Sequence, residues 1–391
     1  MYDVVVVGAG PCGSAAAGYC AAAGLKTLCI EEHATVGHPV QCAGLLSLQA
    51  FAGCGVSRRS VMHEVSGATV ITGSGCRIAF DAGETKAVVV DRTALDAEMA
   101  RRAADAGADL KLKTYAYGMK DRELQVCGVD GHERIPFRMV IAADGPRSPV
   151  ARMLGMQRPP VLLAGIQAEI PHIMDDSRVE LYPDASPDFF GWVIPSGPGR
   201  ARVGLCGLEN VRERFDAFIK AFDPRRIHLV TGAIPLGAMP RTYGPRVLFV
   251  GDAAGFAKPT SGGGIYTGVR SARHAADVAV ECCNGNSFGE SALRDYERRW
   301  KADFGQEIAL GYRLWQARQR IGPAQMQKLC RALNDPSVTR LIVSQGDMDR
   351  PSILVRRLLL KPAVIRACGS LVTTELGKFL TVNKDADFLN K

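Results

Sequence analysis

Residues 3–13 read Asp-Val-Val-Val-Val-Gly-Ala-Gly-Pro-Cys-Gly, so a short β-branched strand runs directly into a Gly-x-Gly-x-x-Gly turn. An alanine-rich segment at residues 14–23 follows the turn and predicts a helix. A second apolar run, at residues 27–30, predicts another strand and ends at Glu31. Strand, glycine turn, helix, strand and acidic residue thus occur in the order that is typical of a dinucleotide-binding βαβ unit.

The three glycines of the turn have separate expected roles. Gly8 permits the tight turn, Gly10 lets a pyrophosphate approach the backbone, and Gly13 lets the helix pack close to the strand. The helix N-terminus supplies free N–H groups and a partial positive charge for the phosphates, and the Glu31 carboxylate can accept hydrogen bonds from a ribose. We therefore predict a dinucleotide site, and a βαβ turn that binds no phosphate is the alternative.

Two later segments extend this site. A buried strand is predicted immediately before Asp144-Gly145, and another before Gly251-Asp252. In a doubly wound sheet, such strand ends line the ligand crevice. We expect a carboxylate at these ends to bind a ribityl hydroxyl, and Gly251 to leave room for the cofactor chain.

Two helix starts complete the expected cofactor contacts. The run Gly262-Gly263-Gly264 precedes a helix that is predicted at residues 266–280, and the first N–H groups of this helix could face the pyrimidine edge of a flavin. Arg92 begins another predicted helix and is expected near the pyrophosphate.

The ordered set of these residues resembles the p-hydroxybenzoate hydroxylase-like flavoproteins over about the first 285 positions. The resemblance implies FAD, rather than NAD, at the first glycine turn. A second Gly-x-Gly-x-x-Gly behind a strand is absent from the sequence, so a nicotinamide-binding domain of the glutathione reductase type is not expected.

The segment at residues 187–195 resembles the Tyr-x-Trp-x-Phe-Pro motif of the geranylgeranyl reductases. Phe190 stands in the place of the Tyr and Ile194 in the place of the Phe, whereas Trp192 and Pro195 match. The alternative is an ordinary aromatic core strand. The resemblance implies that a prenyl-binding cavity is lined by Phe189, Phe190, Trp192, Ile194 and Pro195.

The segment at residues 37–45 resembles the Pro-Val-x-Cys stretch that lies near the flavin in the same family. It makes Cys42 the candidate proton donor, with packing or a conformational lock as the alternative role of this thiol. Relatives often follow the cysteine with Gly-Glu, whereas this chain has Ala43-Gly44, so no acid is expected beside Cys42. Water and the flavin N5–H remain as other proton donors.

The activity that the resemblance implies is the FAD-dependent reduction of isolated C=C bonds in geranylgeranyl chains of isoprenoid lipids, as in archaeal-type membrane lipid biosynthesis. No carbonyl polarises such an alkene, so a proton must accompany the hydride, and the site must exclude water. NADPH, ferredoxin and F420 all stay open as electron donors. One alternative is an FAD-dependent monooxygenase of an apolar or aromatic substrate, and the other is a non-catalytic flavin- or lipid-binding module.

The composition of the chain limits where the protein is expected to be located and which cofactors it is expected to bind. The chain has 391 residues, 47% of them hydrophobic, and no apolar run long enough to span a membrane. The first predicted strand begins at Tyr2, so we expect no signal peptide and a cytoplasmic protein. Its twelve cysteines include no Cys-x-x-Cys pair, and no His or Cys cluster has metal-ligand spacing, so no metal is expected.

Positive charge is concentrated at the C-terminal end. Residues 286–391 carry 18 Lys or Arg against 11 Asp or Glu, a balance of +7 out of the net charge of +8. Apolar runs at residues 353–355 and 358–360 lie between these cations. Such a helix could contact an anionic membrane or bind a lipid head group, with a solvated basic face as the alternative. Nucleic acid is not an expected partner, because no reader motif accompanies the charge.

The predicted fold is mixed α/β. It has a Rossmann-like FAD-binding domain, an inserted antiparallel-sheet substrate domain and a C-terminal helical region. The predicted ranges are 1–60, 88–155 and 240–285 for the FAD domain, 61–87 and 156–239 for the substrate sheet, and 286–391 for the basic helical region.

Overall fold

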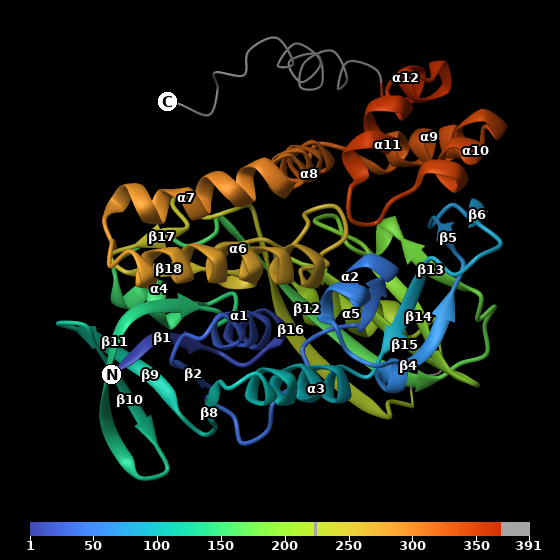
Figure 1. The fold of residues 1–391 in the computed structure, drawn as a ribbon. Coiled ribbons are helices and arrows are strands. Elements are labelled where there is room, and N and C mark those ends of the chain that lie inside the picture. Colours follow the sequence, from blue (N-terminus) through green and yellow to red (C-terminus); the bar gives the residue numbers. More distant parts are fainter. Residues whose placement is uncertain (223–224, 369–391) are drawn as a thin grey trace.

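A mainly parallel sheet carries the glycine turn in the computed structural model, which describes residues 1–222 and 225–368 (Figure 1). The valine run at residues 4–7 forms the buried part of its central strand β1, as expected for a strand that is covered on both faces. A β9–β10 hairpin continues from the long strand β11. The strands, in order across the sheet, are β17 (Tyr243–Gly244), β18 (Val247–Phe249), β11 (Gly131–Ala142), β1 (Tyr2–Val7), β2 (Thr27–Ile30) and β8 (Asp109–Lys111), with β10 (Glu123–Gly128) beside β11 and β9 (Tyr115–Lys120) beside β10.

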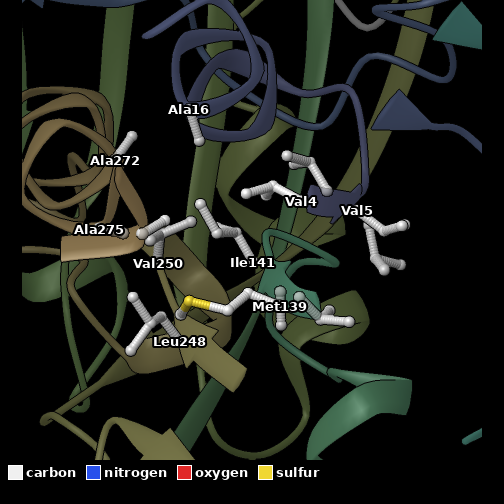
Figure 2. Packing of buried hydrophobic residues seen from close by; sticks show 14 of the residues in the cluster. Val4, Val5, Ala16, Met139, Ile141, Leu248, Val250, Ala272 and Ala275 are labelled. Atoms are coloured by element: carbon white, nitrogen blue, oxygen red, sulfur yellow. The ribbon is translucent and has the colours of Figure 1, made fainter. Parts of the chain in front are cut away.

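Three helices cover this sheet: α1 (Pro11–Ala22), α3 (Arg92–Asp105) and α6 (Ile265–Asn284). Helix α1 packs against both α3 and α6. Figure 2 shows the packing, in which Ala16 of α1 and Ala272 of α6 lie close to Val4 of β1 and Val250. Small side chains on both helices let their backbones approach the sheet closely, and this brings the N-termini of α1 and α6 to the same edge of the sheet.

A second sheet has seven strands and is antiparallel except for the parallel β13–β5 pair. Helix α5 (Val211–Ile219) covers one face through Val211, Phe215 and Ile219. The strands, in order, are β16 (His228–Leu236), β12 (Val161–Pro171), β15 (Arg200–Gly207), β14 (Gly191–Gly197), β13 (Arg178–Tyr182), β5 (Gly67–Ile71) and β6 (Arg77–Asp81).

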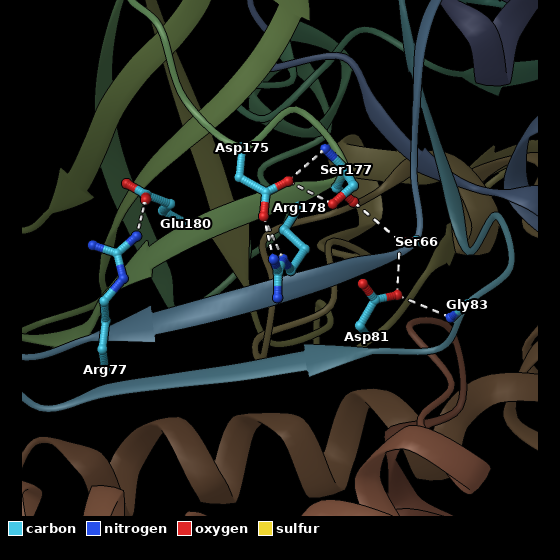
Figure 3. Close-up of polar contacts among 8 residues, drawn as sticks. All are labelled: Ser66, Arg77, Asp81, Gly83, Asp175, Ser177, Arg178 and Glu180. Carbon is cyan, nitrogen blue, oxygen red and sulfur yellow. Dashed lines mark hydrogen bonds and ion pairs between the residues drawn. The ribbon is translucent and has the colours of Figure 1, made fainter.

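Hydrogen bonds from polar side chains link the β5–β6 hairpin to β13 and the residues just before it (Figure 3). The Ser66 hydroxyl donates to Asp81 at 2.9 Å and to the Ser177 carbonyl at 3.3 Å. Arg77 of β6 donates to Glu180 of β13 at 2.7 Å. These contacts tie a segment from the first quarter of the chain into a sheet that is otherwise built from later residues.

One prediction about residues 61–87 is wrong, because part of this segment forms a third, small sheet. Residues 61–87 were all expected in the second sheet, but β4 (Val61–Val65) pairs with β7 (Ala87–Val90), which also pairs with β3 (Leu45–Ser47). The two strands β4 and β7 share buried apolar side chains with Ile194 of β14, so the small sheet packs against the second sheet without joining it.

The C-terminal region is helical up to residue 368, and residues 369–391 of that prediction lie outside the described residues. Helix α10 contacts β6, which places the last helices over the β5–β6 end of the second sheet (Figure 1). In the part of the chain that the structure describes, no helix is both long and apolar enough to cross a membrane. The helices are α7 (Glu290–Trp300), α8 (Gln306–Arg318), α9 (Pro323–Leu333), α10 (Pro336–Gln345), α11 (Pro351–Leu358) and α12 (Pro362–Cys368), and two short ones lie earlier, α2 (Leu48–Cys54) and α4 (Pro149–Met153).

Candidate cofactor and substrate cavity

A cavity of about 1640 Å³ lies between the three sheets and the C-terminal helices. It exceeds the roughly 300–1,000 Å³ that is usual for a single small ligand, so it can take a dinucleotide together with an apolar chain. Of the residues predicted as site residues, Gly13, Pro195 and Gly251 do not line it. Those that do are Gly8, Gly10, Glu31, Cys42, Arg92, Asp144, Gly145, Phe189, Phe190, Trp192, Ile194, Asp252, Gly262, Gly263 and Gly264.

The glycine turn divides into packing positions and one open position. Gly8 has a φ of +97°, and a Cβ on Gly13 would overlap the Gly8 carbonyl oxygen, so these two glycines allow α1 to pack on the turn. A Cβ on Gly10 would meet no protein atom within 4 Å and would project into the cavity. The open position lies beside the N-terminus of α1, which is where a pyrophosphate is expected.

Glu31 connects the end of β2 to this turn. One carboxylate oxygen accepts a hydrogen bond from the Ala9 N–H at 2.8 Å. The other accepts from the His33 N–H at 3.0 Å and lies 2.6 Å from His33 Nδ1. The side chain is therefore held at the cavity wall, beside the glycine turn, in the place expected for contact with a ribose.

Arg92 begins α3 and is held by two hydrogen bonds to Asp96, at 2.9 Å and 2.8 Å. Burial lowers the pKa of Arg92, but Asp96 and Cys42 raise it, and the pKa lies well above the ordinary arginine value. Cys42 is close enough to the guanidinium to affect its pKa, and its sulfur accepts a hydrogen bond from the Gly44 N–H at 3.3 Å. Cys42 is thus fixed in the cavity wall next to a cation.

The two aspartates at the strand ends differ in their surroundings. Both oxygens of Asp144 already accept hydrogen bonds from the start of α4, one from Ser148 Oγ at 2.8 Å and one from the Val150 N–H at 2.8 Å. Burial raises the Asp144 pKa to about 6, although these donors oppose the rise. Asp144 therefore supports the start of α4 by binding its N-cap residue Ser148 and the Val150 N–H, a role that was not predicted from the sequence.

Asp252 instead presents its carboxylate to the cavity. Among the described residues, none donates a hydrogen bond to this side chain. Burial raises its pKa to about 6, and the charge of Arg92 lowers it only in part. A Cβ on Gly264 would lie 2.7 Å from the carboxylate, so the glycine is needed for Asp252 to occupy this position. A partly exposed carboxylate that faces a cavity, and that has no donor in the described part of the chain, fits a ligand hydroxyl that donates to it.

The predicted role of Gly251 is wrong. Gly251 has a φ of +58°, and a Cβ there would lie 2.5 Å from the Cys12 sulfur, so Cys12 rather than a cofactor chain fills the available space. Cys12 itself lines the cavity. The contact joins residues that are far apart in the chain, and no local sequence pattern indicated it.

The glycine run before α6 forms a turn around Lys258, which was not predicted from the sequence. The Lys258 N–H donates to the Gly263 carbonyl at 3.1 Å, and the Lys258 carbonyl accepts from the Gly262 N–H at 2.8 Å. This turn directs the N-terminus of α6, a helix of 20 residues, at the cavity. The positive end of the helix dipole therefore faces the space that a flavin ring is expected to occupy.

The aromatic segment forms a further part of the wall. Phe189 and Phe190 are stacked at 4.4 Å between ring centroids, and Phe190 contacts Trp192 edge-on at 6.3 Å. The Trp192 indole N–H donates to Gln167 Oε1 at 2.9 Å, a buried partner that the sequence did not indicate. These side chains give the cavity an apolar surface with fixed ring positions.

The prediction that Pro195 lines the cavity is wrong. Successive side chains of a strand alternate between its two faces. Trp192 and Ile194 line the cavity, so Pro195 lies on the opposite face with Val193, which packs beneath α5.

Helix α8 holds the loop that carries the aromatic pair. Arg318 donates to the carbonyls of Phe189 at 2.6 Å and Ser186 at 3.0 Å, and Trp315 donates to the Asp188 carbonyl at 2.8 Å. Other C-terminal side chains extend the apolar wall, although no cavity lining was predicted for this region from the sequence. They are Met326, Leu329, Leu333, Ile342, Val343 and Leu354.

Comparison with known proteins agrees with this geometry. Residues 1–224 match the family described as "FAD binding domain". The chain is 32% identical to digeranylgeranylglycerophospholipid reductase 2 of Methanothermobacter thermautotrophicus over 376 residues, which cover 90% of this chain and 98% of the relative. The chain belongs to the geranylgeranyl reductase family. Another family member, digeranylgeranylglycerophospholipid reductase 2 of Methanopyrus kandleri, is 30% identical, with 95% of this chain and 99% of the relative covered.

Solved structures place the fold in the same family. A geranylgeranyl bacteriochlorophyll reductase-like protein from Thermoplasma acidophilum superposes with a TM-score of 0.84 at 28% identity, and the match covers 95% of this chain and 99% of that one. The p-nitrophenol 4-monooxygenase of Pseudomonas putida shares the fold alone, with a TM-score of 0.71, 19% identity and coverage of 88% and 97%. Reductases and oxygenases thus use one architecture, and the fold by itself does not choose between them.

FAD is the cofactor of this geranylgeranyl reductase family member, and the residues present fit it. The open Gly10 position beside α1 suits a pyrophosphate, the unpaired Asp252 carboxylate suits a hydroxyl, and the N-terminus of α6 suits the electron-rich edge of the ring.

Proposed function

We propose that this protein is an FAD-dependent reductase that adds two hydrogens across isolated C=C bonds of geranylgeranyl chains carried by a glycerophospholipid. The observation that supports this most directly is the continuity of the cavity. One space reaches from the glycine turn to the wall of Phe190, Trp192 and Ile194 and on to the apolar side chains of α9 and α10. The relatives that cover the chain almost entirely carry this activity in their names.

The chemistry divides between the cofactor and the protein. Reduced FAD, when bound, supplies a hydride. The protein must then hold the alkene against the flavin-facing part of the cavity and keep water from the carbon on which positive charge develops. The stacked Phe189 and Phe190 rings and the Trp192 indole, which Gln167 fixes, provide a rigid apolar surface for this alignment.

We propose Cys42 as the proton donor for the second hydrogen. Cys42 lines the cavity near the Arg92 guanidinium, and its sulfur accepts a hydrogen bond from the Gly44 N–H, which restricts the position of the thiol in the wall. Cys42→Ala is expected to slow lipid reduction while FAD content stays at the wild-type level. Unchanged turnover would instead favour water or the cofactor as the proton source.

A peripheral contact with the inner face of an anionic membrane would deliver the lipid. Ile353 of α11 is 52% exposed and Leu360, which follows this helix, is 69% exposed, whereas Leu354 lines the cavity. Helix α11 thus exposes one apolar side chain to solvent and contributes another to the cavity wall. The cationic residues Arg357 and Lys361 lie close by in the sequence. Amphipathic helices of this composition bind anionic lipid surfaces.

The membrane proposal is tested by co-sedimentation with phosphatidylglycerol vesicles. Ile353→Glu/Leu360→Glu should reduce binding at least tenfold, and phosphatidylcholine vesicles should bind weakly. Leu162→Glu, at a 40% exposed position on β12, is the matched control and should bind like wild type. Equal binding by all three proteins would contradict the proposal.

The lipid reaction is tested with the protein kept reduced by dithionite and supplied with digeranylgeranylglycerophospholipid in detergent. Mass spectrometry should show products heavier by two hydrogens per reduced bond. The same assay with NADPH, reduced ferredoxin or reduced F420 in place of dithionite identifies the electron donor. A product that gains one oxygen in air, and no hydrogen without air, would favour the monooxygenase alternative.

A further inference from the structure

Lys258 places a buried ammonium group beside the glycine run of the cavity. Its side chain is 6% exposed, and Nζ donates to Asp349 Oδ1 at 2.5 Å and to the Met348 carbonyl at 2.7 Å. A Cβ on Gly263 would lie 3.8 Å from Nζ, so the ammonium is adjacent to the turn that opens α6. No described residue accepts a hydrogen bond from the third N–H of this group, and Lys258 lines the cavity.

Asp349 reaches the same place from the loop between α10 and α11. Its side chain is 1% exposed, and its second oxygen accepts a hydrogen bond from Ser47, the N-cap of α2. Ser47, Lys258 and Asp349 all line the cavity. Three segments from distant parts of the chain thus converge on one buried ion pair beside the expected flavin position.

Charge at this position acts on the bound cofactor. FAD gains electrons when it is reduced, so a nearby cation stabilises the reduced form and a nearby anion opposes it. The N-terminus of α6 already contributes partial positive charge at this corner, and burial of the pair weakens solvent screening. Lys258 would add a full charge, which Asp349 holds in place and partly offsets.

We propose that the Lys258–Asp349 pair sets the reduction potential of the bound FAD, with Lys258 favouring the reduced cofactor and Asp349 limiting that effect. The inference rests on FAD binding in the cavity but not on the identity of the lipid, because the potential is measured without substrate. A failure of the lipid assay would therefore leave it intact, and a failure here would leave the lipid reaction intact.

A purely structural role makes a different prediction. Breaking a buried ion pair leaves one uncompensated charge whichever partner is removed, so both single variants should lower the melting temperature. If the pair only fastened the C-terminal region, the two variants would also change the potential in the same direction or leave it unchanged. The electrostatic role requires opposite directions.

The experiment equilibrates each FAD-loaded protein anaerobically with a reference dye. Lys258→Gln should lower the equilibrium constant for FAD reduction about tenfold and Asp349→Asn should raise it about tenfold, which corresponds to about 30 mV for a two-electron couple. The controls are Arg138→Gln and Asp3→Asn, which break an ion pair of 2.8 Å outside the cavity and should leave the potential unchanged. Shifts of the same sign in the two cavity variants, or none, would overturn the proposal.

A double variant tests the proposal even if the single variants fail to fold. Lys258→Met/Asp349→Leu replaces the pair with apolar side chains, which buried sites often tolerate, and leaves the net charge of the wall unchanged. Because Asp349 only partly offsets Lys258, the potential of this variant should lie below that of wild type but above that of Lys258→Gln. A potential equal to that of wild type, or as low as that of Lys258→Gln, would contradict the proposal. Where a single variant loses FAD on purification, the ratio of its affinities for oxidised and photoreduced FAD gives the same comparison.

Discussion

Cys12 of α1 occupies the space that a side chain on Gly268 of α6 would need, since a Cβ built on Gly268 would overlap the Cys12 sulfur. A Cβ on Gly251 would meet the same sulfur at 2.5 Å. One thiol therefore fills the point at which the first glycine turn, the third predicted FAD segment and α6 come together, and it sets how closely α1 and α6 approach.

Gly268→Ala should destabilise the protein by about 1–3 kcal/mol, the usual cost of overpacking a dense core. Gly268 lies inside a regular helix, so backbone strain does not enter. Cys12→Ala in the same chain removes the sulfur and should recover most of the loss. Denaturant unfolding of the two single variants and the double variant measures this coupling, and additive effects would mean that the two residues do not compete for one space.

Gly10→Val should abolish FAD binding while the protein still folds. Gly10 has a φ of −62° and a ψ of 179°, which any residue adopts, and its Cβ position is open to the cavity. The valine would therefore occupy the place of the pyrophosphate without disturbing protein contacts. FAD content after purification and the melting temperature separate the two effects.

Gly289→Val is the matched control for this variant. Gly289 is also a helix N-cap, has a φ of −72° and a ψ of 167°, and has an open Cβ position, but it does not line the cavity. This control should retain one FAD per chain. Stoichiometric FAD in Gly10→Val would show that the pyrophosphate lies elsewhere.

Trp192→Ala should lower kcat/KM for the lipid at least tenfold and leave FAD content unchanged, because it removes the ring that packs over Gly204 in the apolar wall. Trp192→Phe keeps a ring but leaves the buried Gln167 without its donor, at a cost of about 1–3 kcal/mol in stability. Adding Gln167→Leu to Trp192→Phe should recover much of that stability. Parallel loss of FAD and turnover in Trp192→Ala would instead make Trp192 a structural residue only.

Ionisation of Asp252 should lower the free energy of unfolding of the FAD-free protein as the pH rises from about 4 to 6. Its folded-state pKa is about 6, above the ordinary value of 3.8, so the folded state binds more protons than the unfolded state in this range and the free energy of unfolding falls with pH. Asp252→Asn removes this dependence. The stability of the variant relative to wild type should rise between pH 4 and pH 6, by on the order of 1–3 kcal/mol, and stay constant above.

Asp303 provides the control of opposite sign. Burial raises its pKa, but His274 and Arg270 lower it more, to about 2. Its carboxylate therefore stabilises the fold above pH 4, and this contribution is lost as the pH falls toward 2. Asp303→Asn should be less stable than wild type at pH 7, with a deficit that shrinks in acid, and a pH-independent difference for either variant would contradict these assignments.

Local geometry explains what could be predicted from the sequence. The roles of Gly8, Gly10 and Gly13 depend on one turn between one strand and one helix, and the structure has that turn. The glycine run before α6 and the aromatic segment of β14 are likewise short motifs with their own spacing. Alternation along β14 also contained the signal that excludes Pro195 from the face of Trp192.

The features that could not be predicted from the sequence depend on contacts between segments that are distant in the chain. Residue 12 fills the space at positions 251 and 268, and Lys258 pairs with Asp349 across 91 positions. An apolar strand pattern such as that of β4 does not name its partner, and the wall from α9 and α10 exists only after these helices fold over the second sheet. Such features depend on the whole topology rather than on any local pattern.

The most direct test of the central claim is a single-turnover measurement without oxygen. Photoreduced protein that contains one FAD per chain is mixed with digeranylgeranylglycerophospholipid, and flavin absorbance and lipid mass are followed together. The account predicts that one FAD is reoxidised for each C=C bond lost, with two hydrogens gained by the lipid. A flavin that stays reduced with the lipid and reoxidises only when oxygen is admitted would contradict it.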